Sequence, residues 1–241
     1  MTAPSRIKNV GFDFESNTGT VTVPITNAPS AGNFLFLTLH AAHRETPTPS
    51  EPTWTDPSGW TLIDSEYYAL PDGGTPSLIW WGQTRIYWKT ATASETSVSI
   101  TSTGDGMRYG RIEEFSAATV VSSQSYYGVN AAPSPADTYT SGTTDRSVFW
   151  AITAPKNNFG PGNWTEVDLA NFVQVDRSSS SGSNIFYKGA EYFDQGTSGT
   201  IDLPRLDQVN QDFALNRFPW AAIAVEIRKP LAGWVRGHAW G

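Results

Sequence analysis

Short runs of β-branched and aromatic residues recur along the whole chain, and each is bounded by Gly, Pro, Asn or Ser. No window carries apolar residues at i, i+3, i+4 and i+7 over three turns, as an amphipathic helix would require. Short runs bounded in this way are typical of β-strands. The pattern therefore predicts an all-β fold.

The same order of phrases occurs twice. Residues 56–65 read D-P-S-G-W-T-L-I-D-S, and residues 160–170 read G-P-G-N-W-T-E-V-D-L-A. We interpret Trp60 and Trp164 as matched core residues at strand starts. Four further segments repeat in the same order, at 33–42 and 147–154, 77–90 and 184–193, 97–101 and 199–203, and 111–115 and 221–227. A fixed order of several segments indicates duplication of a half-sandwich rather than a solenoid.

These segments predict a jelly-roll-like antiparallel β-sandwich over residues 1–229, built from two similar halves. The half-repeats span about 10–115 and 147–228 and are joined by an extended crossover at 116–146 that is poor in large aliphatic residues. Two separate β domains are the structural alternative. Residues 10–14 and 20–25 are expected to form an opening pair, and 33–42 a central strand covered on both faces. Residues 230–241 form a Trp- and Gly-rich C-terminal tail.

The charge pattern excludes several classes of partner. The formal net charge is −7, and the basic stripe of a nucleic-acid binder is missing from the sequence. There is no cysteine, hence no disulfide and no thiolate metal site. The first sixteen residues lack the apolar segment of a secretory signal, and the longest apolar runs are too short to span a bilayer. We expect no nucleic-acid partner and no membrane insertion.

The polar motifs do not predict catalysis. Glu113 and Glu114 are adjacent on a predicted strand, so they should point to opposite faces, whereas a glycosidase needs two carboxyls across one cleft. We interpret them as solvated edge charges. His40 and His43 lack an acidic ligand at a suitable spacing. The predicted protein is not an enzyme and has no catalytic residue, cofactor or metal.

Aromatic residues supply the remaining candidate sites. Trp54, Trp80, Trp81 and Trp88 either pack in the core or stack on sugar rings, as tryptophans on a flat sheet face do in carbohydrate-binding modules. Successive strand residues alternate in direction, so one of Trp80 and Trp81 is expected in the core. In the tail, we take Trp234, Arg236 and Trp240 as partner-binding residues because exposed large aromatics mark interaction surfaces; folding of the tail back over the sandwich is the alternative.

Several of these phrases together resemble a known family. The chain has P-S-A-G-N at 29–33, P-S-G-W-T at 57–61, Y-W-K-T-A-T-A-S-E-T at 87–96 and I-E-E-F at 112–115, followed by a weaker second copy. This order resembles the β-sandwich virion proteins of tailed bacteriophages, of the minor tail or head-decoration type. The resemblance covers most of residues 29–228, and the tail lies outside it.

The resemblance implies a structural role without catalysis. We therefore expect a minor tail protein of the bacteriophage virion, made in the host cytoplasm and present in several copies of a symmetric assembly. Other virion proteins would be its partners, bound through loops 44–54, 65–77 and 178–184 and through the tail. A capsid decoration protein, or a carbohydrate-binding module that recognises a host surface glycan, is the alternative.

Overall fold

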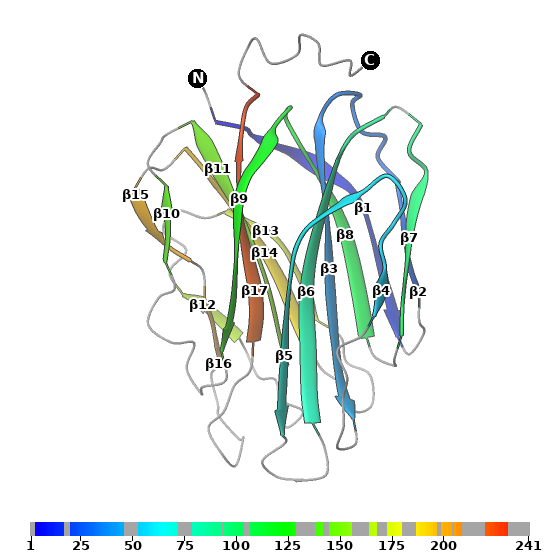
Figure 1. Ribbon diagram of the computed structural model, residues 1–241, viewed down its shortest axis with the longest axis vertical. Coiled ribbons are helices and arrows are strands. Elements are labelled where there is room, and N and C mark those ends of the chain that lie inside the picture. The colour runs from blue at the N-terminus through cyan, green and yellow to red at the C-terminus, as the bar shows by residue number, and fades with distance from the viewer. Residues whose placement is uncertain are drawn as a thin grey trace, which may run out of the picture.

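The predicted all-β class is confirmed by a computed structural model. It describes residues 3–16, 20–45, 53–71, 79–92, 94–103, 107–128, 138–141, 145–155, 164–167, 173–179, 187–196, 199–203, 205–208 and 220–230. All secondary-structure elements in this part of the chain are β-strands, and the strands pair antiparallel. Figure 1 shows them arranged as a β-sandwich with the strands nearly vertical.

The first half of the chain forms one large and one small sheet. The large sheet has five strands in the order β1 (Arg6–Ser16), β8 (Met107–Phe115), β3 (Phe34–Glu45), β6 (Ile79–Thr90) and β5 (Thr61–Pro71). The small sheet has three strands in the order β2 (Thr20–Pro24), β7 (Ser97–Ser102) and β4 (Trp54–Thr55).

The second half forms another five-stranded sheet and two short strand pairs. The order of the large sheet is β13 (Val173–Ser179), β14 (Tyr187–Gln195), β11 (Arg146–Pro155), β17 (Trp220–Arg228) and β9 (Thr119–Gly128). The short pairs are β10 (Thr138–Ser141) with β15 (Gly199–Asp202), and β12 (Trp164–Val167) with β16 (Arg205–Gln208).

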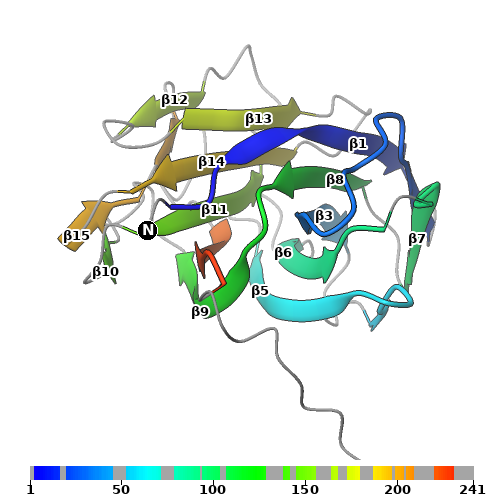
Figure 2. The ribbon, with the colours of Figure 1, turned by 90° about the horizontal axis from the view of Figure 1, so that it is seen from above.

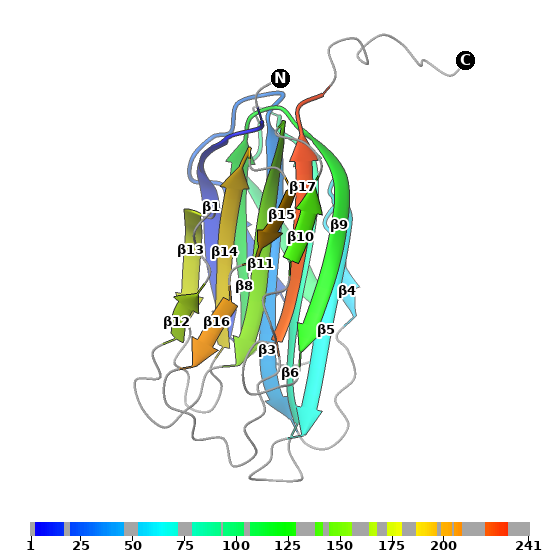
Figure 3. The ribbon, with the colours of Figure 1, turned by 90° about the vertical axis from the view of Figure 1, so that its left-hand side faces the viewer.

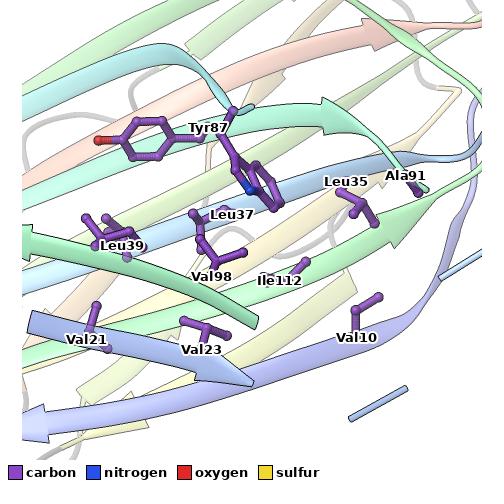
Figure 4. Close-up of a cluster of buried hydrophobic side chains, with 12 residues drawn as sticks. Val10, Val21, Val23, Leu35, Leu37, Leu39, Tyr87, Ala91, Val98 and Ile112 are labelled. Carbon is purple, nitrogen blue, oxygen red and sulfur yellow. The ribbon is translucent and has the colours of Figure 1, made fainter. Parts of the chain in front are cut away.

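Three hydrophobic cores hold these sheets together in layers. The central core lies between the two five-stranded sheets and contains Phe36, Phe149 and Val225. A second core fills the space between the first large sheet and β2–β7, where Val21, Leu37 and other side chains meet (Figure 4). The third lies between the second large sheet and β10–β15. Each large sheet is therefore covered on both faces, as seen from above in Figure 2.

Alternation along β3 explains this layering from the sequence. Leu35, Leu37 and Leu39 point into the core beneath β2–β7, while Phe34 and Phe36 point toward the second large sheet. Successive strand residues face opposite sides, so a strand buried on both faces must be apolar throughout. The prediction that this segment is a central, doubly covered strand is confirmed.

The two large sheets share one strand order. The first runs β1-β8-β3-β6-β5, and the second, read from its other end, runs β9-β17-β11-β14-β13. The bulges also coincide: the pairing of β5 with β6 skips Ile63, and that of β13 with β14 skips Val175. Likewise β1 skips Ile7, and β9 skips Val121; a second bulge of β1, at Val10, has no counterpart in the pairing of β9. Four of the five predicted segment pairs occupy corresponding strands. Origin by duplication and jelly-roll wiring stay predictions.

Residues at corresponding positions meet where the halves touch. The Phe36 ring stacks on that of Phe149, with centroids 4.9 Å apart. His40 Nδ1 lies 2.6 Å from Thr153 Oγ1, and these two residues are 113 positions apart in the chain, as are Phe36 and Phe149. Residues that contact their own counterparts lie on a two-fold axis. Both pairs occur in the same order, so β3 and β11 run in the same direction along this internal axis (Figure 3).

The predicted matching of Trp60 with Trp164 is wrong. Trp60 is buried in the core of the first half just before β5. Trp164 instead begins β12, which pairs with β16 outside the five-stranded sheet. The registers match Thr61 with Val173, beside equivalent positions of β6 and β14. The shared N/G-W-T phrase therefore reflects similar local sequence and not an equivalent place in the fold.

Three connections also differ from the sequence prediction. Segment 116–146 is more than a crossover, because it contains β9, an edge strand whose side chains are exposed or half-buried and hence largely polar. Strands β1 and β2 do not pair with each other but with β8 and β7, in different sheets. The predicted loop 65–77 begins inside β5, which continues to Pro71.

Candidate functional site

The four tryptophans predicted to stack on sugars have different environments. Trp81 on β6 is 1% exposed. Trp88, near the end of the same strand, is half-buried and stacks on Phe34, with ring centroids 5.2 Å apart and planes inclined by 7°. Trp80 lies in β6, but its side chain is outside the described residues. Trp54 in β4 is half-buried. As predicted, one member of the Trp80–Trp81 pair is in the core.

Trp54 is the centre of an aromatic–arginine cluster at the edge of the small sheet. Alternation along β6 points Gln83 and Arg85 toward it, and the indole Nε1 donates to Gln83 Oε1 at 2.5 Å. The guanidinium carbons of Arg85 and Arg108 each lie 5.9 Å from the indole centroid. Arg108 also donates from Nε to Ser102 Oγ at 2.6 Å. Cation–π contacts of this type stabilise a desolvated ring by about 0.5–2 kcal/mol each.

Asp56 is the solvent-facing member of this cluster. Its carboxylate accepts hydrogen bonds from the Tyr87 hydroxyl at 2.8 Å and from Arg85 Nη2 at 3.2 Å. The Asp56 side chain is 54% exposed, whereas that of Arg85 is 11% exposed. Burial raises the pKa of Tyr87 to about 12; Arg85 opposes this shift, and the hydrogen bond to Asp56 adds to it. Tyr87 therefore remains a neutral donor that fixes the carboxylate in place.

The cluster offers a ligand one partly exposed indole and one carboxylate. A sugar platform of the predicted kind requires two exposed, coplanar rings. Among the candidate tryptophans with described side chains, each is buried or half-buried: Trp54, Trp81 and Trp88. The guanidinium groups over Trp54 also compete with any sugar ring for its face. These contacts are explained by a structural role: the cluster holds β4 against β6 and β8.

Glu113 and Glu114 form two separate buried ion-pair systems. As predicted, they face opposite ways. Glu113 accepts from Arg6 Nε at 2.8 Å and from Arg111 Nε at 2.5 Å, while Glu114 accepts from the Ser30 amide at 2.8 Å. Their exposures of 1% and 0% show that the interpretation as solvated edge charges is wrong. Lys8 Nζ lies 3.5 Å from Glu114 and supplies its opposite charge. Arg6, Lys8 and Ser30 come from distant parts of the chain, whereas Arg111 precedes Glu113 by two positions on the same strand.

The other predicted polar sites are resolved only in part. His40 is buried between the large sheets and is bonded to Thr153. Within the described ranges, no three His, Cys, Asp or Glu side chains lie close enough together to hold a metal ion. The side chain of His43 and the tail residues Trp234, Arg236 and Trp240 are outside the described residues. None of the described segments is a helix of the length and apolarity needed to cross a membrane.

Sequence reasoning missed the exposed apolar side chains. In the described part of the chain, the large apolar residues that are exposed all lie on β1 and β9, the strands that open the two halves: Ile7 at 46%, Phe12 at 59%, Val121 at 45% and Tyr127 at 67%. Both strands are at sheet edges. Ile7 and Val121 are the bulged residues at corresponding positions. One feature of the sequence could have revealed this edge: residues 119–128 contain apolar and hydroxyl side chains but no charged residue.

Comparison with known proteins gave no relative of this chain: no protein-family model, no curated protein and no solved structure matches it.

Proposed function

We propose that this chain is a non-enzymatic structural protein of a tailed-bacteriophage particle, most simply a minor tail protein, that acts through protein–protein contacts. The observation that carries the proposal is the distribution of exposed apolar side chains. They lie on β1 and β9 at sheet edges and not around a cluster of reactive groups. Exposed apolar surface at the edge of a sheet suits addition of a strand from another protein.

The buried charges support the same role. Both adjacent glutamates are paired with cations inside the sandwich, so they serve the fold and do not form a reactive site at the surface. The resemblance of the phrases at 29–33, 57–61, 87–96 and 112–115 to tailed-phage virion proteins supplies the particular setting. The proposed partners are other virion proteins, in several copies of a symmetric assembly.

The test is detection of the chain in purified particles. We expect it to copurify with infectious virions, and we expect labelling with a specific antibody to decorate the tail. Labelling spread over the head would favour a capsid decoration protein instead. Absence of the chain from particles would overturn the structural role.

The tail residues can be tested in the same particles. If Trp234, Arg236 and Trp240 bind a partner, deletion of 230–241 abolishes incorporation while the truncated protein still folds. A matched control replaces the exposed Thr22 on β2, which lies on neither β1 nor β9, with alanine in the full-length chain. Normal incorporation of the deleted form would show that the tail does not dock on a virion partner.

A further inference from the structure

The two large sheets together have four edge strands, and one differs in charge from the other three. β1 contains Arg6, Lys8, Asp13 and Glu15, β5 contains Asp64 and Glu66, and β13 contains Asp176 and Arg177. β9, with the sequence T-V-V-S-S-Q-S-Y-Y-G, contains no charge and no proline. Charged residues, prolines and β-bulges are among the means by which proteins prevent edge strands from pairing. β9 has one bulge, at Val121 near its start, but neither a charge nor a proline.

β9 is an accessible edge strand. Among the described strands it pairs with β17 alone, and none of its side chains is buried. Two of its hydroxyls already form hydrogen bonds within the same molecule. Ser122 Oγ bonds to the Tyr139 hydroxyl, and the Tyr126 hydroxyl donates to the Thr138 carbonyl. Val121, Gln124 and Tyr127 are exposed.

The exposed residues are symmetric about Gln124. Val121 precedes it by three positions and Tyr127 follows it by three. An antiparallel two-fold pair centred on Gln124 would therefore set Val121 of each copy opposite Tyr127 of the other, and Ser123 opposite Ser125. Aromatic residues opposite β-branched ones are favourable cross-strand pairs, and like charges in opposition are unfavourable. A strand without charge avoids such opposition in its own two-fold pair.

We propose that β9 is a self-pairing edge through which two copies of this chain associate, joining their second large sheets into one continuous antiparallel sheet. The occupant of the edge is a second copy because the strand is neutral and its exposed apolar residues complement one another about a two-fold axis. β1 exposes Ile7 and Phe12 at the other side of the molecule, but its charged side chains make it a poorer edge for self-pairing. The inference deepens the proposed assembly role and rests on it.

Single cysteines provide a direct test, since the chain has none of its own. With Gln124→Cys, the two new thiols face each other on the axis. Directly opposed strand residues have Cβ atoms about 4.5–5.5 Å apart, which is close to the separation of about 3.5–4.5 Å in a disulfide. We expect disulfide-linked dimers under mild oxidation, formed about tenfold faster than with Thr22→Cys, an exposed control position on β2. Equal rates for the two variants would overturn the proposal.

A charge at the axis provides the second test. Gln124→Lys places two ammonium groups opposite each other, so the dimer dissociation constant measured by sedimentation should rise about tenfold or more. Thr22→Lys adds the same charge away from the edge and should leave it unchanged. Circular dichroism and urea unfolding of each variant separate loss of pairing from loss of folding.

The failures of the two proposals are distinguishable. A wild-type chain that stays monomeric at about 100 μM overturns self-pairing, even if the protein is found in virions. A monomer whose β9 instead captures a different virion protein overturns it too. Absence from particles overturns the assembly role, whatever the purified chain does.

Discussion

Single side chains in the first half show how charge is used inside this sandwich. Glu113 is enclosed by two guanidinium groups, and Asp56 is held by Arg85 and the Tyr87 hydroxyl. For the buried Glu113, removing one partner typically costs about 3–5 kcal/mol, because the remaining charge is left uncompensated; the half-exposed Asp56 is screened by solvent and contributes less. These groups are therefore part of the fold, and Tyr87 offers a measurable reporter of it.

We expect Tyr87→Phe to change how stability depends on alkaline pH. Below pH 10 the folded and unfolded chains both keep the Tyr87 proton. Between pH 10 and about 12 the unfolded chain releases it while the folded chain holds it, so the free energy of unfolding falls as the pH rises. Without this hydroxyl the variant should lose less stability over that window, by about 1–2 kcal/mol after allowance for solvent screening.

Urea unfolding of both proteins at several pH values measures the difference. The other buried tyrosines are common to both proteins and cancel in the comparison. Parallel stability curves for the two proteins would contradict the assignment of the raised pKa to Tyr87.

Alternation along a strand made the directions of side chains predictable, but it did not predict which charged side chains are buried. It gave the opposite directions of Glu113 and Glu114, and the burial of one member of the Trp80–Trp81 pair. It could not give the burial of the glutamates, because Arg6, which neutralises Glu113, is 107 positions away in the chain. Long-range ion pairs leave no mark on local sequence, so a buried carboxylate and a solvated one look alike there.

At the scale of elements, the crossing of β1 beneath β2 is the tightest junction. A Cβ added at Gly11 would collide with the carbonyl oxygen of Pro24, which is backbone and cannot rotate away. Two amides, those of Thr26 and Asn27, donate to the Val10 carbonyl at 3.0 Å beside it. The glycine therefore allows the large and small sheets to approach at this point.

We expect Gly11→Ala to destabilise the protein by about 1–3 kcal/mol, because the backbone must move to accept the methyl group. Phe12→Ala is the matched control. Its side chain is 59% exposed, so its effect should stay within about 0.5 kcal/mol. Urea denaturation of both variants gives the values; equal stabilities would mean that β1 and β2 can separate without cost.

Element boundaries followed the sequence closely where strands are doubly covered. Strand β3 is apolar over most of its first half and was predicted as 33–42, three residues short of its end at Glu45, whereas β9 was taken for part of a crossover. An edge strand with exposed or half-buried side chains needs few aliphatic residues, so its composition resembles that of a loop. The partners of β1 and β2 were also unpredictable, since a short connection between two strands does not require that they pair with each other.

At the scale of the whole molecule, the two halves share one core. Phe36 and Phe149 stack across the central interface, and Thr153 from the second half bonds both His40 and Thr84 of the first. Neither half can lose its large sheet without exposing the inner face of the other. This contiguity opposes the alternative of two separate β domains.

We therefore expect the chain to unfold in a single transition, with equal calorimetric and van't Hoff enthalpies. Phe36→Ala should lower the free energy of unfolding by about 3–5 kcal/mol and shift that transition as a whole. Scanning calorimetry of the wild type and the variant provides the measurement. Two resolved transitions, with only one moved by the substitution, would show that the halves are independent.

Four of the five predicted segment pairs occupy corresponding strands, because buried strands keep their hydrophobic pattern. The repeated order of segments did not anticipate how the halves face each other. Which surfaces of two similar sheets meet depends on the shapes of side chains such as Phe36 and Phe149, and these are equally apolar whether they face a partner sheet or a small covering one.

Joining the two halves in one polypeptide removes a restriction that identical subunits obey. At the axis of a dimer of identical chains, a residue can meet only its own kind, so histidine would face histidine. Here His40 meets a threonine, and an imidazole nitrogen and a hydroxyl share one hydrogen. The two halves therefore need not match at every position: β1 contains charged residues whereas its counterpart β9 contains none, so the molecule presents different edge strands on its two sides.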